Sequence, residues 1–206
     1  MPTTFSRPFV VAAAALALVG LIACAGSASA AGPLDELRRA FALGGKPVPP
    51  DLFRDFGDAD LGDSLPSVVT IDVEAAIGSN RYGDPIARRG DWIMQTRPAA
   101  GSLNETDETG YHYVGATRNG LLVVIAYYNG GGSGYFHTLH ILDASLAVGL
   151  DDDGKPYQRV NLTVLRSVVL GDRWQGEATI VGDMVRIKTT RTPAESVPAQ
   201  IEAKRP

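Results

Sequence analysis

The hydrophobic positions follow two different periods along the chain. Leu34, Leu37 and Phe41 recur at helical spacing, and charged residues occupy the other side of this segment, which predicts one short amphipathic helix. From Val68 onward the period is two, and Gly-Asp or Asn-Gly pairs separate short runs rich in β-branched and aromatic residues. This second pattern is typical of an antiparallel β domain.

Eight runs within the β domain are predicted to be strands. They are Val68–Ala76, Asp91–Gln95, Tyr111–Thr117, Leu121–Tyr128, Tyr135–Leu142, Tyr157–Leu170, Gln175–Val181 and Met184–Thr190. The run Leu121–Tyr128 lacks charged and amide side chains, so both of its faces must be covered. We therefore predict a mainly β fold: an antiparallel β-sandwich or partly open barrel with one short N-terminal amphipathic helix packed on it.

The N-terminal 30 residues have the layout of a secretory signal. Arg7 lies in a short polar start, an apolar stretch runs from Pro8 to Ala25, and Ala28-Ser29-Ala30 fits cleavage after Ala30. An alternative is offered by Leu21-Ile22-Ala23-Cys24, which resembles a bacterial lipobox, with cleavage before a lipidated Cys24. The interpretation divides the chain into a signal peptide (1–30, or 1–23 for a lipoprotein), a helix with a Pro/Asp-rich connection (31–67), a β domain (68–192) and a disordered tail (193–206).

Composition narrows the classes of partner and cofactor. The net charge of −4 over 206 residues offers no basic face for phosphate contacts, so we expect no nucleic-acid partner. Cys24 is the single cysteine, which leaves the folded domain without a disulfide or a cysteine-bound zinc. His137 and His140 are three residues apart on a predicted strand and so point to opposite faces. We therefore expect no metal and no cofactor.

The glycine-rich loop near Ser133 contains part of a nucleophile motif. Gly131-Gly132-Ser133-Gly134 begins like G-x-S-x-G, but the fifth position is Tyr135 and the context is strand-loop-strand, whereas a nucleophile elbow requires strand-turn-helix. We therefore predict no catalytic residue here, and we interpret Ser133 as part of a hairpin loop that contributes to a binding surface.

The predicted hairpin registers place several tyrosines together. A two-residue type I′ turn at Asn119-Gly120, followed by a six-residue loop over 129–134, sets three tyrosines in one row across three strands, on one face. The row is Tyr111, Tyr128 and Tyr135, with Tyr113 and His137 in the row beside it. Such a row either packs internally or forms a stacking platform for a sugar or a partner's side chains.

Arg166 interrupts an apolar face of its predicted strand, where Val164 and Val168 are its neighbours on the same side. A buried guanidinium requires a carboxylate partner, and such a pair could mark a ligand pocket. We expect Arg166 to be at least partly buried. The alternative is a bend or bulge in the strand that carries Arg166 to the surface.

These observations predict an exported small β-domain protein of the bacterial envelope. We expect a non-enzymatic protein, periplasmic or secreted, that binds an envelope protein or a small ligand through the glycine-rich loop and the adjacent tyrosines. If Cys24 is lipidated, the protein is an outer-membrane lipoprotein that touches the membrane through its lipid alone. The alternative function is a secreted hydrolase that uses Asp or Glu with His.

Export can be tested by intact-mass measurement of the protein recovered from its native host. The expected result is loss of the first 30 residues, or loss of the first 23 with added lipid mass on Cys24. Recovery of a full-length, unmodified chain from the cytoplasm contradicts both forms of the prediction.

Overall fold

The structure is a computed structural model, which describes residues 32–54, 68–72, 85–99, 105–190 and 197–205. The chain divides into two units, Met1–Ala30 and Ala31–Pro206, and all described residues belong to the second. The predicted signal segment and most of the acidic connection after Arg54 lie outside the described residues.

The described residues form one short α-helix, one 3₁₀ helix and three antiparallel sheets. The N-terminal elements are α1 (Pro33–Ala40), β1 (Ala42–Leu43), β2 (Lys46–Pro47) and the 3₁₀ helix η1 (Pro50–Phe53). The strands of the central sheet are β3 (Val68–Asp72), β4 (Ile86–Arg89), β5 (Trp92–Pro98), β6 (Thr106–Ala116), β7 (Leu122–Asn129), β8 (Phe136–Leu150) and β9 (Pro156–Asp172). The C-terminal strands are β10 (Gly176–Val181), β11 (Met184–Thr189) and β12 (Gln200–Glu202).

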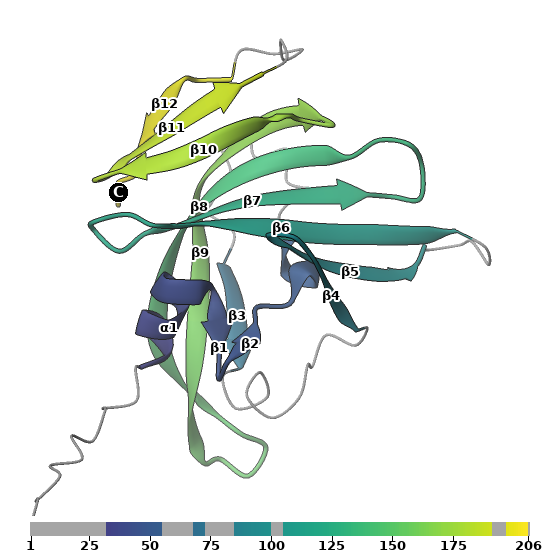
Figure 1. The fold of residues 1–206 in the computed structure, drawn as a ribbon. Coiled ribbons are helices and arrows are strands. Elements are labelled where there is room, and N and C mark those ends of the chain that lie inside the picture. The colour runs from purple at the N-terminus through teal and green to yellow at the C-terminus, as the bar shows by residue number, and fades with distance from the viewer. Residues whose placement is uncertain (1–31, 55–67, 73–84, 100–104, 191–196, 206) are drawn as a thin grey trace, which may run out of the picture. The chain divides into compact units, whose positions relative to one another are not determined.

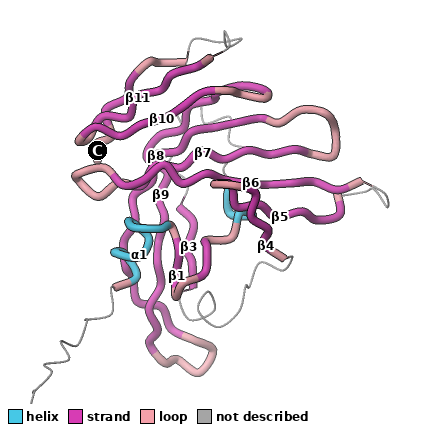
Figure 2. The backbone as a smooth tube through the Cα atoms, in the orientation of Figure 1, coloured by secondary structure: helices cyan, strands magenta, loops and turns pink. Residues whose placement is uncertain are grey.

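The seven-stranded sheet, in the order β3-β9-β8-β7-β6-β5-β4, is covered on both faces. On one face Leu122 and Val124 of β7 pack with residues of α1, β1 and η1. On the other face Val123 and Ile125 pack with β11 and β12 of the three-stranded sheet. Figures 1 and 2 show the helical segments on one side of the central sheet and β10 and β11 on the other. The predicted sandwich with one packed helix is confirmed.

The aromatic contacts of the core tie α1 to the central sheet. Leu37 is fully buried, and the helix ends at Phe41, whose backbone is left-handed with φ of 48°. The Phe41 ring lies 5.3 Å from the ring of Tyr111 and 5.4 Å from that of Tyr113. The Tyr113 hydroxyl donates a 2.6 Å hydrogen bond to the carbonyl of Arg38. Both tyrosines therefore belong to the packing interface between the helix and the sheet.

The β6–β7 hairpin differs from the predicted type I′ turn. The amide of Gly120 donates to the carbonyl of Thr117, and the amide of Thr117 donates to the carbonyl of Leu121, which makes a three-residue loop over 118–120. Gly120 has φ of +85°, whereas Asn119 does not adopt positive φ, so the turn is type I with a left-handed glycine. A further register shift between Tyr113 and Gly115 moves the ladder again.

A bulge in β9 lies directly before Arg166, which is exposed. Ile141 pairs with Arg166 but Leu142 pairs with Val164, so Leu165 is the extra residue. The bulge changes which face the alternating side chains take: Val164 packs in the N-terminal core, whereas Val168 packs in the C-terminal one. Arg166 is exposed. The expected buried guanidinium is wrong, and the bulge alternative is correct.

The predicted disordered tail is also corrected over part of its length. Residues 200–202 form β12, which pairs with β11 so that Ile201 lies opposite Val185. Ile201 and Ala203 are almost completely buried. The Asn119 side-chain amide also donates a 2.8 Å hydrogen bond to the carbonyl of Ala203. A three-residue strand shows no period in the sequence, because its burial depends on a sheet made by other segments.

A buried aspartate holds η1 against the sheet. Asp107 of β6 is 2% exposed and accepts contacts from Arg54 at 2.9 Å and from Arg97 at 3.3 Å. Arg97 also contacts Asp51 at 2.9 Å. A buried carboxylate is tolerated only with such partners. The cluster therefore connects β5, β6 and the N-terminal layer.

Replacing Asp107 by Asn should lower the free energy of unfolding by about 3 kcal/mol, because two arginines lose their shared partner. Denaturant unfolding measures the change. The control is Asp153→Asn, which removes an exposed contact to Lys155 at 3.2 Å and should change stability by less than about 1 kcal/mol. Equal effects of the two substitutions would contradict a structural role for Asp107.

Candidate functional site

The predicted tyrosine row does not exist, because its members lie on both faces of the sheet. Tyr111 pairs with Ala126 instead of Tyr128, and Tyr128 pairs with Phe136 instead of Tyr135. Tyr111 is buried under Phe41 and Phe53, and its neighbour Tyr113 lies on the same face. Two turns, each one residue longer than predicted, and the shift beyond Tyr113 account for the error.

The same registers assemble a different cluster on the opposite face. Tyr127 pairs with His137, and around them lie side chains from β5, from the loop before β8 and from the segment after β9. This cluster, called the aromatic patch below, consists of Trp92, Tyr127, Tyr135, His137 and Trp174. The Tyr127 ring centroid is 5.2 Å from Trp92, 5.7 Å from Tyr135 and 5.7 Å from His137. His137 is also 5.8 Å from Trp92 and 6.4 Å from Trp174.

Tyr127 is the fixed centre of the aromatic patch. Its hydroxyl donates a 2.7 Å hydrogen bond to Glu108, and its ring covers Gly110 on the paired strand. A Cβ at Gly110 would overlap the Tyr127 ring, so glycine is required there. Burial and the Glu108 carboxylate raise the pKa of Tyr127. The phenol therefore stays protonated at neutral pH.

Asn129 organises the glycine-rich loop beside the patch. Its side-chain amide donates to the carbonyls of Gly132 at 2.9 Å and Gly134 at 2.7 Å, and its carbonyl oxygen accepts from the amide of Gly131 at 2.8 Å. Asn129 is buried, whereas Ser133 is exposed. The loop is thus built around one polar side chain, and Ser133 is exposed at its tip.

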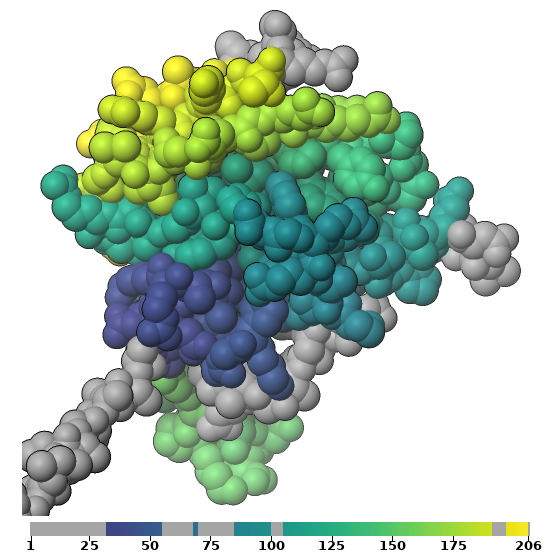
Figure 3. All heavy atoms as spheres, in the orientation of Figure 1, coloured from purple at the N-terminus to yellow at the C-terminus, as the bar shows by residue number. Residues whose placement is uncertain are grey.

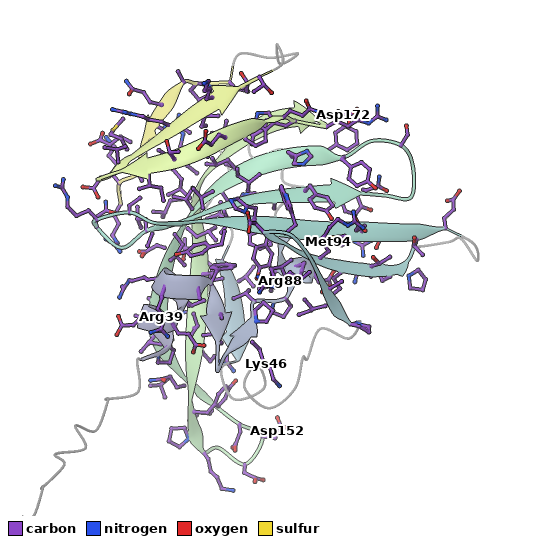
Figure 4. All side chains as sticks on the ribbon, viewed as in Figure 1. Arg39, Lys46, Arg88, Met94, Asp152 and Asp172 are labelled. Carbon is purple, nitrogen blue, oxygen red and sulfur yellow. The ribbon has the colours of Figure 1, made fainter. Side chains whose placement is uncertain are left out.

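Asp172 and Arg173 attach the loop to the end of β9. Asp172 accepts a 2.7 Å hydrogen bond from the amide of Tyr135, and the amide of Arg173 donates to the Tyr135 carbonyl at 2.7 Å. The Arg173 guanidinium donates to the carbonyl of Ser133 at 3.1 Å. Arg173 has a left-handed backbone, with φ of 48°, which a non-glycine residue adopts at some cost. Figure 4 labels Asp172 at this end of the strand.

His137 serves the structure of the loop. Its Nδ1 lies 2.8 Å from the carbonyl of Tyr135, and because a carbonyl only accepts, Nδ1 carries the proton. Burial lowers the pKa of His137, although the Tyr135 carbonyl and Asp172 oppose this effect. The imidazole is therefore neutral at pH 7. The patch combines aromatic faces with carboxylates and an arginine at its rim, which suits binding.

A histidine and a serine also meet on the other face, inside the core. His140 Nδ1 is 2.9 Å from Ser167 Oγ, and the His140 ring stacks on Phe53 at 5.8 Å. His140 is 1% exposed, and burial lowers its pKa to about 4. A base of that strength is poorly matched to activating a serine at neutral pH. We interpret this pair as a core contact.

Tyr135, His137 and Ser133 are predicted from the sequence to belong to a binding surface, whereas Trp92, Tyr127 and Trp174 are not. One signal could have found them: the chain contains two tryptophans, and both lie in the patch. The proximity of Tyr127 and His137 can be predicted only from the correct strand registers. The local sequence pattern predicts neither the register shift after Tyr113 nor the length of the second loop.

A groove of about 530 Å³ lies between β6 and β10, lined by small and aliphatic side chains with Arg118 as its charged residue.

No group of three or more histidine, cysteine, aspartate or glutamate side chains in the described part is arranged to hold a metal ion. Within the same residues, no helix has the length and apolar character needed to cross a bilayer. Because the aromatic patch gathers rings from several elements of the fold at one place, we take it as the candidate binding site in this part of the chain.

Comparison with protein families, with curated proteins and with solved structures finds no match for this chain.

The lowered pKa of His140 makes stability depend on pH in a defined direction. The pKa of His140 is about 6.5 in the unfolded chain and about 4 in the folded protein. As the pH falls from about 6.5 to about 4 the unfolded state takes up the proton first, so up to about 3 kcal/mol of stability is lost. Below that range the loss stops.

Denaturant unfolding of wild type and His140→Gln at pH 7.5 and pH 4.5 isolates this contribution. The variant should lose less stability on acidification than wild type. The loss that remains in the variant comes from His137, whose pKa is also lowered, and from carboxylates. Parallel pH profiles for the two proteins would show that His140 is not held neutral in the folded state.

Proposed function

We propose that the protein is an exported, non-enzymatic binding protein whose ligand is a saccharide held on the aromatic patch. The observation that carries the proposal is the gathering of both tryptophans, two tyrosines and a neutral histidine at one place on the sheet. Trp92 and Trp174 pack against the core between the two sheets and are only partly buried, so part of the cluster faces solvent. Export and a periplasmic or secreted location remain part of the proposal, on the strength of the N-terminal pattern.

The exposed part of the patch offers flat apolar surface beside hydrogen-bond acceptors. Tyr135 is 37% exposed, and Trp92 and His137 are half-buried. Aromatic faces stack on the apolar face of a sugar ring, while Glu108 and Asp172 can accept hydrogen bonds from ring hydroxyls. A partner protein could use the same rings, but the carboxylates at the rim favour a ligand rich in hydroxyl donors.

The positions of these rings are set before any ligand arrives. Tyr127 is held by Glu108 and by its contact with Gly110, and Tyr135 is held through its backbone by Asp172 and Arg173. A binding surface that is already ordered loses less conformational entropy on association. This arrangement supports recognition by the loop and patch without rearrangement of the sheet.

Intrinsic fluorescence offers a direct test, because the chain's two tryptophans both lie in the patch. Titration with soluble tetrasaccharides of glucose and of N-acetylglucosamine should give a saturable change in emission. Tyr135→Ala should weaken binding by about tenfold through the loss of one stacking face. The stability of the variant, measured by denaturant unfolding, should stay close to that of wild type.

Phe136→Ala is the matched control, since Phe136 is the next residue, is 61% exposed and points to the opposite face of the sheet. This variant should bind the tetrasaccharides like wild type. The proposal fails if neither sugar changes the emission, or if loss of Phe136 weakens binding as much as loss of Tyr135. If the patch binds a protein and no sugar, the ligand of the patch is a protein partner and not a saccharide.

A further inference from the structure

The chain contains two Asn-Gly pairs, and their environments differ. They are Asn119-Gly120 in the β6–β7 turn and Asn129-Gly130 at the end of β7. In such a pair the glycine nitrogen can attack the side-chain carbonyl carbon of the asparagine, because glycine has no side chain to hinder the approach. Asn-Gly is therefore especially prone to spontaneous deamidation. Asn119 is exposed, whereas Asn129 is 5% exposed.

Deamidation requires water and no other reactant. The Gly120 nitrogen gives up its proton to solvent and forms a bond to Cγ of Asn119. The Cγ–Nδ2 bond then breaks, and ammonia leaves after taking a proton from water. A water molecule opens the resulting succinimide at either of its two carbonyls. One opening yields aspartate, and the other yields isoaspartate, in which the main chain runs through the former side chain.

Hydrogen bonds restrain both reacting groups of Asn119-Gly120. The Gly120 amide donates to the Thr117 carbonyl at 2.9 Å. In the Asn119 side chain, Oδ1 accepts from the Thr117 hydroxyl and Nδ2 donates to the Ala203 carbonyl at 2.8 Å. Rotation of this side chain toward Gly120 breaks both of its bonds, and ionisation of the Gly120 amide breaks the third. The rate of deamidation therefore depends on how often the turn opens.

The C-terminal segment, residues 197–205, supplies part of this restraint. Its Ala203 carbonyl binds the Asn119 side chain, and Arg205 Nη1 donates to the Asn119 carbonyl at 3.0 Å. Figure 3 shows the yellow C-terminal atoms beside the teal atoms of the β6–β7 turn. β12 pairs with β11 over three residues, and chain ends are among the first parts of a fold to open. Asn119 loses two of its contacts when this segment detaches.

The second Asn-Gly pair is held within its own loop. The Asn129 side chain bonds to backbone groups of Gly131, Gly132 and Gly134. None of these three contacts involves the C-terminal segment, so they persist when that segment detaches. Asn129 therefore provides an internal reference for Asn119 in the same molecule.

We propose that Asn119 is a site of spontaneous deamidation whose rate is controlled by docking of the C-terminal segment. While the segment is docked, the Asn119 side chain stays bound to Ala203 and the reaction is slow. Detachment frees the side chain, and the succinimide forms. Neither product restores the contact, because a carboxylate has no N–H to donate to the Ala203 carbonyl and isoaspartate lengthens a three-residue loop. The modification therefore weakens docking permanently.

Peptide mapping by mass spectrometry during incubation of the full chain at pH 8 tests the control of the rate. Arg205→Ala removes the contacts of the C-terminal segment with Asn119 and Asp143. It should speed deamidation of Asn119 by about fivefold, because the segment detaches more often. The matched control is Lys204→Ala, which removes an exposed contact to Glu202 at 3.7 Å and should leave the rate unchanged.

Ile201→Ala loosens β12 without altering the turn or any charge, and it should also speed deamidation of Asn119. The rate at Asn129 separates local detachment from unfolding of the whole domain, since global unfolding accelerates both sites. The proposal is overturned if neither Arg205→Ala nor Ile201→Ala speeds the reaction at Asn119, or if Asn129 responds equally.

Hydrogen exchange tests the consequence of the modification. The Ala203 amide donates to the Asp183 carbonyl at 2.8 Å, so its exchange reports docking of the C-terminal segment. Asn119→Asp reproduces one product and should speed this exchange by about fivefold. Gln158→Glu makes the same chemical change at an exposed position of β9 and should leave the exchange unchanged. Equal exchange in Asn119→Asp and wild type contradicts the weakened docking.

Discussion

The organisation of the folded unit depends on the need to cover β7 on both faces. Leu122, Val124 and Ala126 point to one side, and Leu121, Val123 and Ile125 in and beside the same strand point to the other. A strand with apolar side chains on both faces is stable only as the middle layer of a sandwich. The N-terminal helix and the C-terminal strands, far apart in the sequence, are therefore both required, because each completes the core on one face of the sheet.

The two covering layers are fixed to the central sheet by different kinds of interaction. The N-terminal layer combines aromatic packing of Phe41 with the buried Asp107, which holds Arg54 and Arg97. The C-terminal layer relies on aliphatic contacts and on hydrogen bonds at the β6–β7 turn, where Asn119 binds the carbonyl of Ala203. The residue that marks the turn in the sequence thus also attaches the C-terminal segment.

Small irregularities in strand pairing decide on which face of the sheet the aromatic and polar side chains lie. The loop at Gly120, the longer loop before Phe136 and the bulge at Leu165 each alter the register or the face of the residues beyond them. Tyr111 and Tyr113 become core residues, whereas Tyr127 joins His137 in the aromatic patch. Because side chains alternate with a period of two, a shift of one residue exchanges the solvent face for the core face.

The sequence by itself determined the fold class, the helix, parts of most strands and the double burial of β7, because each of these depends on local periodicity and on turn-forming residues. It did not predict strand β4 or the continuation of β8 from Leu142 to Leu150. The tertiary structure alone decided the strand registers, the burial of Ile201 in the C-terminal segment and the exposure of Arg166. It also decided the membership of the aromatic patch. Positions of this kind depend on long-range pairing, in which bulges and loop lengths are chosen by packing against segments that local patterns do not identify.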